Sequence, residues 1–340
     1  MNILVIRFSA FGDVAMTVPV LSSFARSFPD NRISLLSNKR LESLFTGMPN
    51  NFDFIGVDLK SDYSGIGGIF RLFALLRKRD FRMVADFHGV VRSGILSVLF
   101  FITGVRVVSI RKGRIDRWRV TRRWQKRNLE LKPIYCRYND VLNRLGFSVK
   151  LNFQSVFGDE KGDFNRIKNF TGERGYKRWI GIAPFAAHIG KIYPINMMER
   201  VVATLAELED TVLYVFAYGA ESEKVEGWRN LSESVILVNG QLSMIEELIL
   251  ISHLNVMLAM DSSNSHLASL TGIPVVSVWG ATHPSLGFLG YNQTLDNCAQ
   301  SKIDCRPCSA FGKKPCIYND YRCLSDISPK MIVDMVKRYL

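Results

Sequence analysis

Residues 261–280 read DSSNSHLASLTGIPVVSVWG, and this stretch decides the fold class of the chain. The apolar run Leu254–Met260 predicts a buried strand that ends where the stretch begins. Ser262–Asn264 then suits a helix N-cap, and Ile273–Trp279 predicts the next strand. Such a turn presents backbone N–H groups, hydroxyls and the His266 imidazole at the carboxyl edge of a sheet, where open α/β sheets bind phosphate-bearing ligands. An ordinary capped strand–helix turn is the alternative.

A second turn of this kind lies near the N-terminus, in IRFSAFGDVAMTVPVL, residues 6–21. Ile3–Ile6 predicts the first strand, Ser9–Gly12 a short turn, and Asp13 the start of a helix that runs to residue 28. A dinucleotide-binding fingerprint requires three glycines here and only Gly12 is present, which excludes a nicotinamide site and argues against an epimerase. Asp13 could instead act only through a favourable interaction with the helix dipole, which stabilises a helix by about 0.3–1 kcal/mol.

The length of 340 residues favours two domains of ordinary size, and an apolar content of 47% excludes a disordered chain. The N-terminus shows no signal-peptide pattern, and the longest apolar stretch, residues 93–105, is shorter than the ~20 residues that span a bilayer. That stretch predicts a helix of a soluble protein or, at most, a surface that touches lipid. We therefore expect cytoplasmic residence.

Strands and helices alternate along the chain, which predicts an α/β fold of parallel sheets with helices on both faces. We expect two doubly wound, Rossmann-like domains that face each other across a cleft, over residues 1–160 and 161–327. A final helix in residues 328–340 is expected to pack back on the N-terminal domain. The predicted strands are 2–7, 32–37, 54–58, 82–87, 105–110, 179–183, 212–217, 235–238, 254–260 and 274–279. The predicted helices are 14–28, 66–79, 91–102, 134–145, 195–208, 221–230, 243–252 and 262–271.

Positive charge is concentrated in the first half of the chain. Residues 1–160 hold 26 Lys and Arg against 13 Asp and Glu, whereas residues 161–340 hold 18 of each. The excess is densest over residues 106–127, where Trp118 and Trp124 are interspersed. A field of this sign attracts nucleic acid, anionic lipid or a phosphorylated substrate. A nucleic-acid-binding protein that uses this basic stretch and a solvated basic helix without a ligand are the alternatives to an enzyme.

Six short motifs follow one another along nearly the whole chain. The set resembles glycosyltransferase family 9, the lipopolysaccharide heptosyltransferases, and this resemblance implies a GT-B fold. The motifs are Ser9-x-x-Gly12-Asp13; Asp86-x-x-Gly89 followed by Arg92-Ser93; Lys191-x-x-Pro194; Gly219-x-x-x-Glu223; Asp261 followed by Ser265-His266-Leu267-Ala268; and Gly280-x-x-x-Pro284.

The resemblance implies inverting, metal-independent transfer of a heptose or related sugar from an ADP-sugar to an acidic, lipid-linked core oligosaccharide, with no required cofactor. It implies Asp13 as the general base that takes the proton of the acceptor hydroxyl. The departing diphosphate requires positive charge in the transition state. The further implied residues are Lys191, Asp261, Ser262, Ser263 and His266 for the diphosphate, Glu223 and Leu242 for the nucleoside, and Ser9, Gly12 and Arg92 for the acceptor. The implied location is the cytoplasmic face of the inner membrane, by peripheral contact, and no specific nucleic acid is expected.

Several positions depart from the family pattern. Ala186 and Ala187 stand where hydroxyl residues are common, Tyr193 replaces a tryptophan, and Ser263 stands where glycine is frequent. These changes leave another sugar or another nucleotide open.

Cysteines gather near the C-terminus, in the loop 298–323. Cys305, Cys308, Cys316 and Cys323 are spaced as C-x2-C-x7-C-x6-C. Four thiolates in this order could hold a structural zinc ion, while reduced packed thiols and a disulfide are the alternatives. We expect this loop to take no part in the chemistry.

Overall fold

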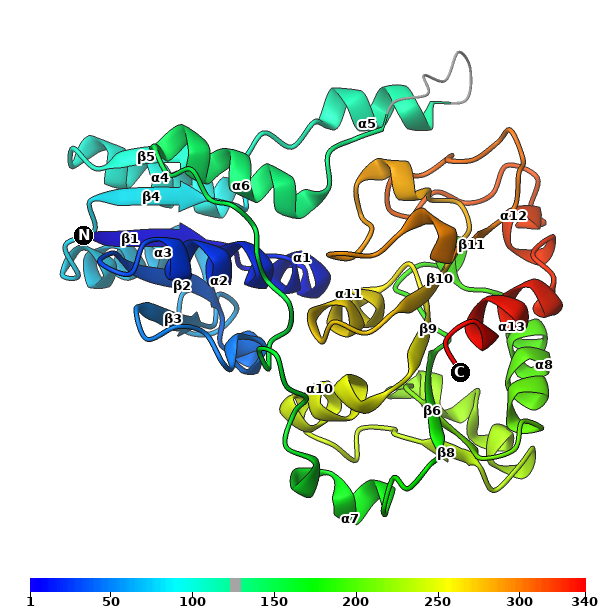
Figure 1. The fold of residues 1–340 in the computed structure, drawn as a ribbon. Helices are drawn as coiled ribbons and strands as arrows, with labels where there is room; N and C mark the ends of the chain where they lie inside the picture. The colour runs from blue at the N-terminus through cyan, green and yellow to red at the C-terminus, as the bar shows by residue number, and fades with distance from the viewer. Residues whose placement is uncertain (123–129) are drawn as a thin grey trace. The chain divides into compact units, whose positions relative to one another are not determined.

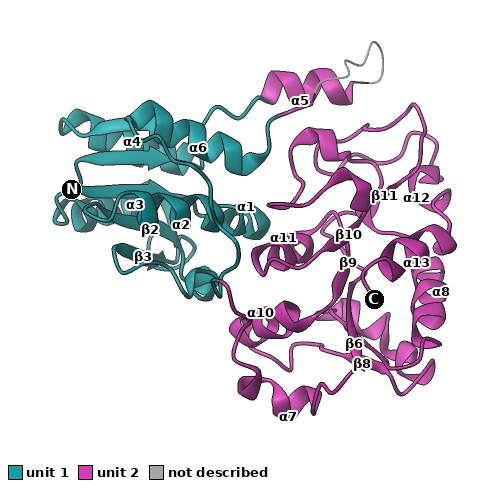
Figure 2. Ribbon diagram, in the orientation of Figure 1, with its two compact units in different colours: residues 1–113, 132–158 teal, residues 114–131, 159–340 magenta. Residues whose placement is uncertain are grey.

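The computed structural model describes residues 1–122 and 130–340, which form two compact units (Figure 2). Unit 1 comprises residues 1–113 and 132–158, and unit 2 comprises residues 114–131 and 159–340. The end of unit 1 lies close to the expected boundary at residue 160, but the segment 114–131 groups with unit 2. The Leu131 N–H donates to the Ser285 carbonyl at 2.8 Å, and the apolar side chains of Val120 and Leu131 are buried against Leu286. These contacts explain why the segment 114–131 belongs to unit 2 and not to unit 1.

Unit 1 is built on a parallel sheet of five strands in the order β3-β2-β1-β4-β5 (Figure 1). The central strand pairs on both sides, with Ile3 opposite Ile33 of one neighbour and Met83 of the other. Its residues Ile3–Ile6 are fully buried because helices cover both faces of the sheet, as a continuous apolar run predicts. The strands are β1 (Asn2–Ile6), β2 (Arg32–Asn38), β3 (Phe52–Val57), β4 (Met83–Asp86) and β5 (Arg106–Ser109).

The helices of unit 1 form two layers, since α2 contacts α6 and α3 contacts α4. The prediction of a single helix over residues 14–28 is wrong. The structure divides this segment at Thr17 into two helices, α1 and α2. Pro19 stands in the first turn of α2, where its missing N–H costs nothing, and that position favours a new helix start. The helices are α1 (Phe11–Ala15), α2 (Val18–Ser27), η1 (Lys39–Phe45), α3 (Gly65–Arg77), α4 (Val91–Ile102) and α6 (Ile134–Leu145).

Unit 2 holds a second parallel sheet, of six strands in the order β11-β10-β9-β6-β7-β8 (Figure 1). The last strand was not predicted, because three residues carry too little pattern to be read as a strand. The strands are β6 (Arg178–Ala183), β7 (Thr211–Val215), β8 (Val235–Leu237), β9 (Val256–Met260), β10 (Val275–Trp279) and β11 (Cys298–Gln300).

The C-terminal helix α13 (Pro329–Lys337) packs in unit 2, where it contacts α8 (Ile195–Ala206). Its inward side chains Ile332 and Val336 are fully buried in the core of that unit, whereas the sequence led us to expect packing on the N-terminal domain. The other helices of unit 2 are α5 (Arg114–Thr121), η2 (Phe164–Arg166), α7 (Lys168–Thr171), η3 (Ile189–Lys191), α9 (Ala220–Glu223), η4 (Glu226–Asn230), α10 (Met244–His253), α11 (Ser263–Leu270), η5 (Pro284–Leu286), η6 (Leu295–Asn297) and α12 (Arg322–Ser325).

Among the described residues, no helix has both the length and the apolar character that crossing a membrane requires. Most of the apolar stretch 93–105 lies in α4, which is one of the helices that cover the sheet of unit 1.

Candidate active site

In unit 1, Asp13 lies in the short helix α1, just past the carboxyl end of β1. Its carboxylate forms an ion pair with Arg7, whose side chain is 7% exposed while that of Asp13 is 31% exposed. Asp13 therefore combines access to solvent with a fixed position.

Arg7 is itself held from several sides. Its Nη1 donates to the Phe87 carbonyl at 2.8 Å, and its guanidinium lies over the Tyr138 ring at 5.7 Å. Tyr138 stacks on Phe87 and donates its hydroxyl to the Asp13 carbonyl at 3.0 Å. Sequence reasoning missed Arg7, although a charged residue directly after a buried strand was a usable signal.

A second loop of unit 1, after β4, is organised by Asp86. Its Oδ1 accepts the backbone N–H groups of His88 and Gly89, both at 2.8 Å, and its Oδ2 accepts the Ser93 hydroxyl at 3.1 Å. This network sets the start of α4, where Arg92 is exposed. Since β1 and β4 are parallel neighbours, Arg92 and Asp13 follow the same edge of the sheet. Ser9 is exposed and Gly12 half-buried in the adjoining turn.

His88 is expected to make the stability of the fold depend on pH. Burial, with the charges of Arg7 and Lys112, lowers the pKa of His88 from 6.5 to about 3. Between these values the unfolded chain binds a proton that the folded chain does not, so the free energy of unfolding falls as pH falls. We expect His88→Asn to weaken this dependence by up to about 1.4 kcal/mol per pH unit. Urea unfolding of both proteins from pH 7 to pH 4 measures it, and parallel curves would contradict the assignment.

In unit 2, Lys191, Asp261 and Thr282 meet at the carboxyl ends of β6, β9 and β10, which are neighbours in the sheet. The Lys191 Nζ lies 2.8 Å from Asp261 Oδ2 and donates to the Asp261 carbonyl at 3.0 Å. The Thr282 hydroxyl donates to the same carboxylate oxygen at 2.7 Å. Asp261 is nearly completely buried, while the Lys191 side chain is 15% exposed and so reaches the surface of the site. Thr282 was not predicted.

The helix α11 begins directly beside this cluster. Ser262 is its N-cap, but the side chain makes no capping hydrogen bond, and the buried Ser262 hydroxyl has no partner in the described chain. The first N–H groups of the helix therefore lack a side-chain acceptor. Ser263 is exposed, and His266 is buried within the first turn. An anion would find both dipole and donors here.

The Cys-rich loop packs directly behind these residues. Arg306 is buried and donates to the carbonyls of Gly280 and Thr282, at 2.6 and 3.0 Å. A Cβ at Gly312 would lie 2.7 Å from the Lys191 side chain, so the backbone of this loop covers the lysine stem. The expectation that the loop is remote from the proposed chemistry is therefore wrong, because it positions both Lys191 and the turn that contains Thr282.

Of the alternatives left open for the cysteines, the zinc site is not formed in the described chain, which includes all six cysteines. No three His, Cys, Asp or Glu side chains among the described residues are grouped to hold a metal ion, and the cysteines are free thiols. Packing accounts for two of them, since Cys298 and Cys323 are buried and their burial raises the pKa of each thiol.

Gly280 is expected to be required for this packing. A Cβ at this position would lie 2.5 Å from the Gly190 carbonyl oxygen and 2.6 Å from Leu324 Cγ. We expect Gly280→Ala to destabilise the protein by about 1–3 kcal/mol, because overpacking forces the backbone apart. Gly67→Ala is the matched control: it lies inside α3 with nothing within 4 Å of the added carbon, and should stabilise by up to about 1 kcal/mol. Thermal melts measure both, and equal melting temperatures would contradict the prediction.

The two residues predicted to contact the nucleoside follow β7 and β8, and they differ in exposure. Glu223 is exposed on α9 and Leu242 is half-buried before α10. Sequence reasoning missed the pair beside them, in which the Tyr218 hydroxyl donates to Glu247 at 2.7 Å. Burial raises the pKa of both groups. A buried acid beside a phenol offers fixed acceptors at the edge where a nucleoside would lie.

One of the family departures, Tyr193, and one residue of the basic stretch, Arg117, have structural explanations. Tyr193 is completely buried and donates its hydroxyl to the Ile327 carbonyl at 2.5 Å, and burial raises its pKa to about 12, so it is a core residue. In the basic stretch, the Arg117 guanidinium lies over the rings of Phe288 and Phe311, at 5.1 and 5.7 Å, and so packs on unit 2. Trp124 and the other residues in 123–129 lie outside the described part of the chain.

Two doubly wound units with polar carboxyl edges are the architecture of GT-B glycosyltransferases, and comparison with solved structures shows this fold. A family 9 glycosyltransferase from Veillonella parvula superposes with a TM-score of 0.76 over 99% of this chain and 96% of that one, at 17% identity. The Escherichia coli ADP-heptose heptosyltransferase II superposes with a TM-score of 0.72 at 16% identity, over 100% and 98% of the two chains.

The sequence also places the chain within one family. Residues 69–320 match the family model described as glycosyltransferase family 9 (heptosyltransferase). The chain belongs to glycosyltransferase family 9. Among curated relatives it is similar to lipopolysaccharide heptosyltransferase 3 of Escherichia coli, with 22% identity over 80% of this chain and 81% of the relative. Lipopolysaccharide heptosyltransferase 1 of Campylobacter coli is 23% identical over 83% and 84%. The Asp13 turn precedes the residues that the family model matches.

Proposed function

We propose that this glycosyltransferase transfers a heptose, with inversion and without a metal ion, from ADP-heptose to a phosphorylated, lipid-linked core saccharide of lipopolysaccharide. The names of the curated relatives support the sugar and the pathway. Solved relatives of the same fold include an Escherichia coli heptosyltransferase with bound ADP, which supports the nucleotide. The observation that carries the proposal is the Lys191–Asp261–Thr282 cluster beside the uncapped start of α11.

In this proposal, unit 2 binds the donor. The diphosphate lies at the start of α11, where the backbone N–H groups, the Ser262 and Ser263 hydroxyls and His266 surround it. Lys191 then approaches the oxygens that become more negative as the bond from the sugar to the phosphate breaks. Glu223 and Leu242 contact the nucleoside, with Tyr218 and Glu247 behind them. Asp261 does not touch the donor; it holds the ammonium group of Lys191 in place.

Unit 1 activates the acceptor. A sugar hydroxyl is a weak nucleophile, so a carboxylate must take its proton as the new bond forms. Asp13 is a partly exposed carboxylate at the carboxyl end of the central strand, and the pairing with Arg7 fixes its orientation. Ser9, Gly12 and Arg92 contact the acceptor, and Arg92 supplies a cation for its phosphate groups. The ion pair with Arg7 holds Asp13 where the hydroxyl arrives. We place this work at the cytoplasmic face of the inner membrane.

A donor screen tests the proposal. Thermal melts of the purified chain with ADP-, UDP-, GDP- and CDP-sugars should show the largest rise in melting temperature with ADP-heptose, since a ligand that binds only the folded state stabilises it. Transfer is then measured with ADP-heptose and a core saccharide that lacks heptose. A larger rise with a UDP- or GDP-sugar would overturn the donor assignment.

A further inference from the structure

The α3 and α4 helices of unit 1 expose an unusual number of large apolar side chains. The two helices contact each other, so their outward faces form one continuous area, which we term the α3–α4 surface. Seven of its side chains are between 46% and 80% exposed. They are Ile66, Phe70, Leu75, Val91, Val98, Phe101 and Ile102.

These side chains are not the inward faces of amphipathic helices. The inward positions are filled by other residues, such as Leu72 of α3 and Leu96 and Phe100 of α4, which are buried in the core against β1. In α4 the residues Val91, Val98 and Ile102 follow helical spacing on the outward side, where a surface helix ordinarily carries charges. Scattered exposed apolar residues are ordinary, but a contiguous apolar area marks an interaction surface.

Positive charge borders this surface. The segments 65–79 and 91–106 contain six Lys and Arg residues and no Asp or Glu. Arg77 and Lys78, at the end of α3, are exposed and form no ion pair within the described chain. An apolar area with a cationic border matches the layering of an anionic bilayer, in which acyl chains lie beneath negative headgroups.

We propose that the α3–α4 surface docks on an anionic phospholipid bilayer. A second copy of the chain fits less well, because a symmetric contact would bring the same cationic borders together. The proposal rests on the proposed function, since a lipid-linked acceptor requires the enzyme at a membrane. The start of α4 lies at the same sheet edge as Asp13, and its end, with Phe101 and Ile102, lies at the opposite edge, so the α3–α4 surface extends as far as the acceptor-binding edge of unit 1.

Vesicle sedimentation tests this surface. The full chain is mixed with vesicles of phosphatidylcholine alone or with one third phosphatidylglycerol. We expect sedimentation with the anionic vesicles, weakened by salt, and at least a tenfold lower partition coefficient for Phe101→Asp combined with Ile102→Asp. Arg77→Glu combined with Lys78→Glu should reduce binding similarly without altering the apolar area. Leu295→Asp combined with Ile317→Asp, at exposed apolar positions of unit 2, is the control and should bind like the unchanged protein.

Transfer to a delipidated, soluble acceptor is measured on the same proteins, and all variants should retain it. Equal sedimentation of all variants, or no sedimentation of the unchanged chain, would overturn the bilayer as the partner. Dimerisation in the absence of lipid that Phe101→Asp combined with Ile102→Asp abolishes would assign the surface to a second copy instead. Failure of transfer from ADP-heptose would overturn the proposed function while leaving the sedimentation result interpretable by itself.

Discussion

Asp13→Asn is expected to lower kcat by a factor of about 10²–10⁴, the usual contribution of a general base, while the affinity for ADP stays unchanged. Asparagine keeps the size of the side chain and can still accept a hydrogen bond from Arg7, but it cannot take a proton. The nucleotide is bound by unit 2 in our proposal, so its affinity should not respond. Single-turnover transfer and calorimetric ADP binding measure the two quantities.

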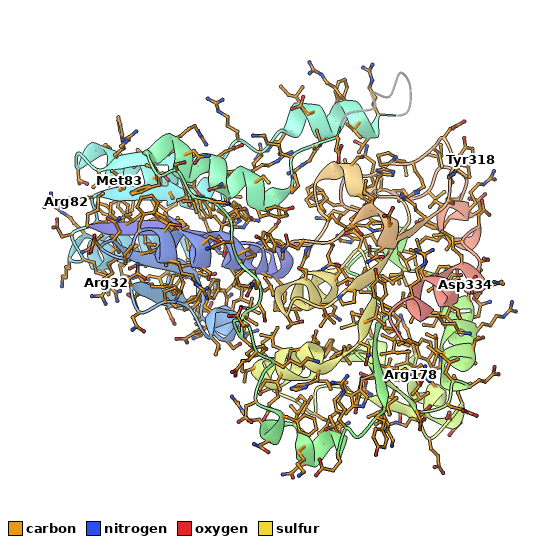
Figure 3. All side chains as sticks on the ribbon, viewed as in Figure 1. Arg32, Arg82, Met83, Arg178, Tyr318 and Asp334 are labelled. Carbon is orange, nitrogen blue, oxygen red and sulfur yellow. The ribbon has the colours of Figure 1, made fainter. Side chains whose placement is uncertain are left out.

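The control for this variant is Asp80→Asn, which also removes an aspartate that pairs with an arginine in unit 1. Asp80 precedes β4, so it lies near the amino edge of the sheet, which Arg82 and Met83 mark in Figure 3. It should leave turnover unchanged. Turnover of Asp13→Asn equal to that of the unchanged enzyme would show that another group is the base.

Lys191→Met is expected to lower kcat by a factor of about 10²–10³, comparable to the loss of one donor to a developing oxyanion. It also leaves the buried Asp261 carboxylate without its cation, so it should destabilise the fold by about 3–5 kcal/mol. Adding Asp261→Asn removes the uncompensated charge and should restore most of the stability. It should not restore turnover, because the diphosphate still lacks the ammonium group.

This pair of variants separates the two roles of Lys191. Urea unfolding reports stability, and single-turnover transfer with saturating donor reports the chemical step. If the double variant recovered both stability and turnover, the lysine would be a structural residue only. If both variants lost stability but not turnover, the proposed role at the diphosphate would be wrong.

The sequence predicts the alternation of strands and helices well because most of the strands contain a run of apolar residues. It fails where structure depends on contacts between distant segments. The segment 114–131 reads as part of the first half, yet the burial of Val120 and Leu131 against Leu286 groups it with unit 2. The three-residue strand β11 and the packing of α13 on α8 likewise depend on tertiary neighbours that local pattern does not contain.

At the candidate site, motif spacing pointed to Lys191 and Asp261, and the structure places them in contact. Thr282 lies inside the last motif, but no role was predicted for it, and motif spacing gave no signal for Arg306. The roles of both residues arise from hydrogen bonds between loops that are far apart in the chain. The cysteine spacing suggested a metal site because four cysteines that include a Cys-x-x-Cys pair are typical of zinc ligands. In the structure, that loop instead supports the lysine and the turn beside it.

The contact between Lys191 and Asp261 has a consequence for selectivity. Because the ammonium group already has a carboxylate partner, a small free anion such as inorganic phosphate gains little by replacing it. In our proposal an intact sugar nucleotide gains more, because it engages the helix start and the residues proposed for the nucleoside at once. In our proposal Asp261 keeps the ammonium group in position after the spent nucleotide has left, which readies the enzyme for another cycle.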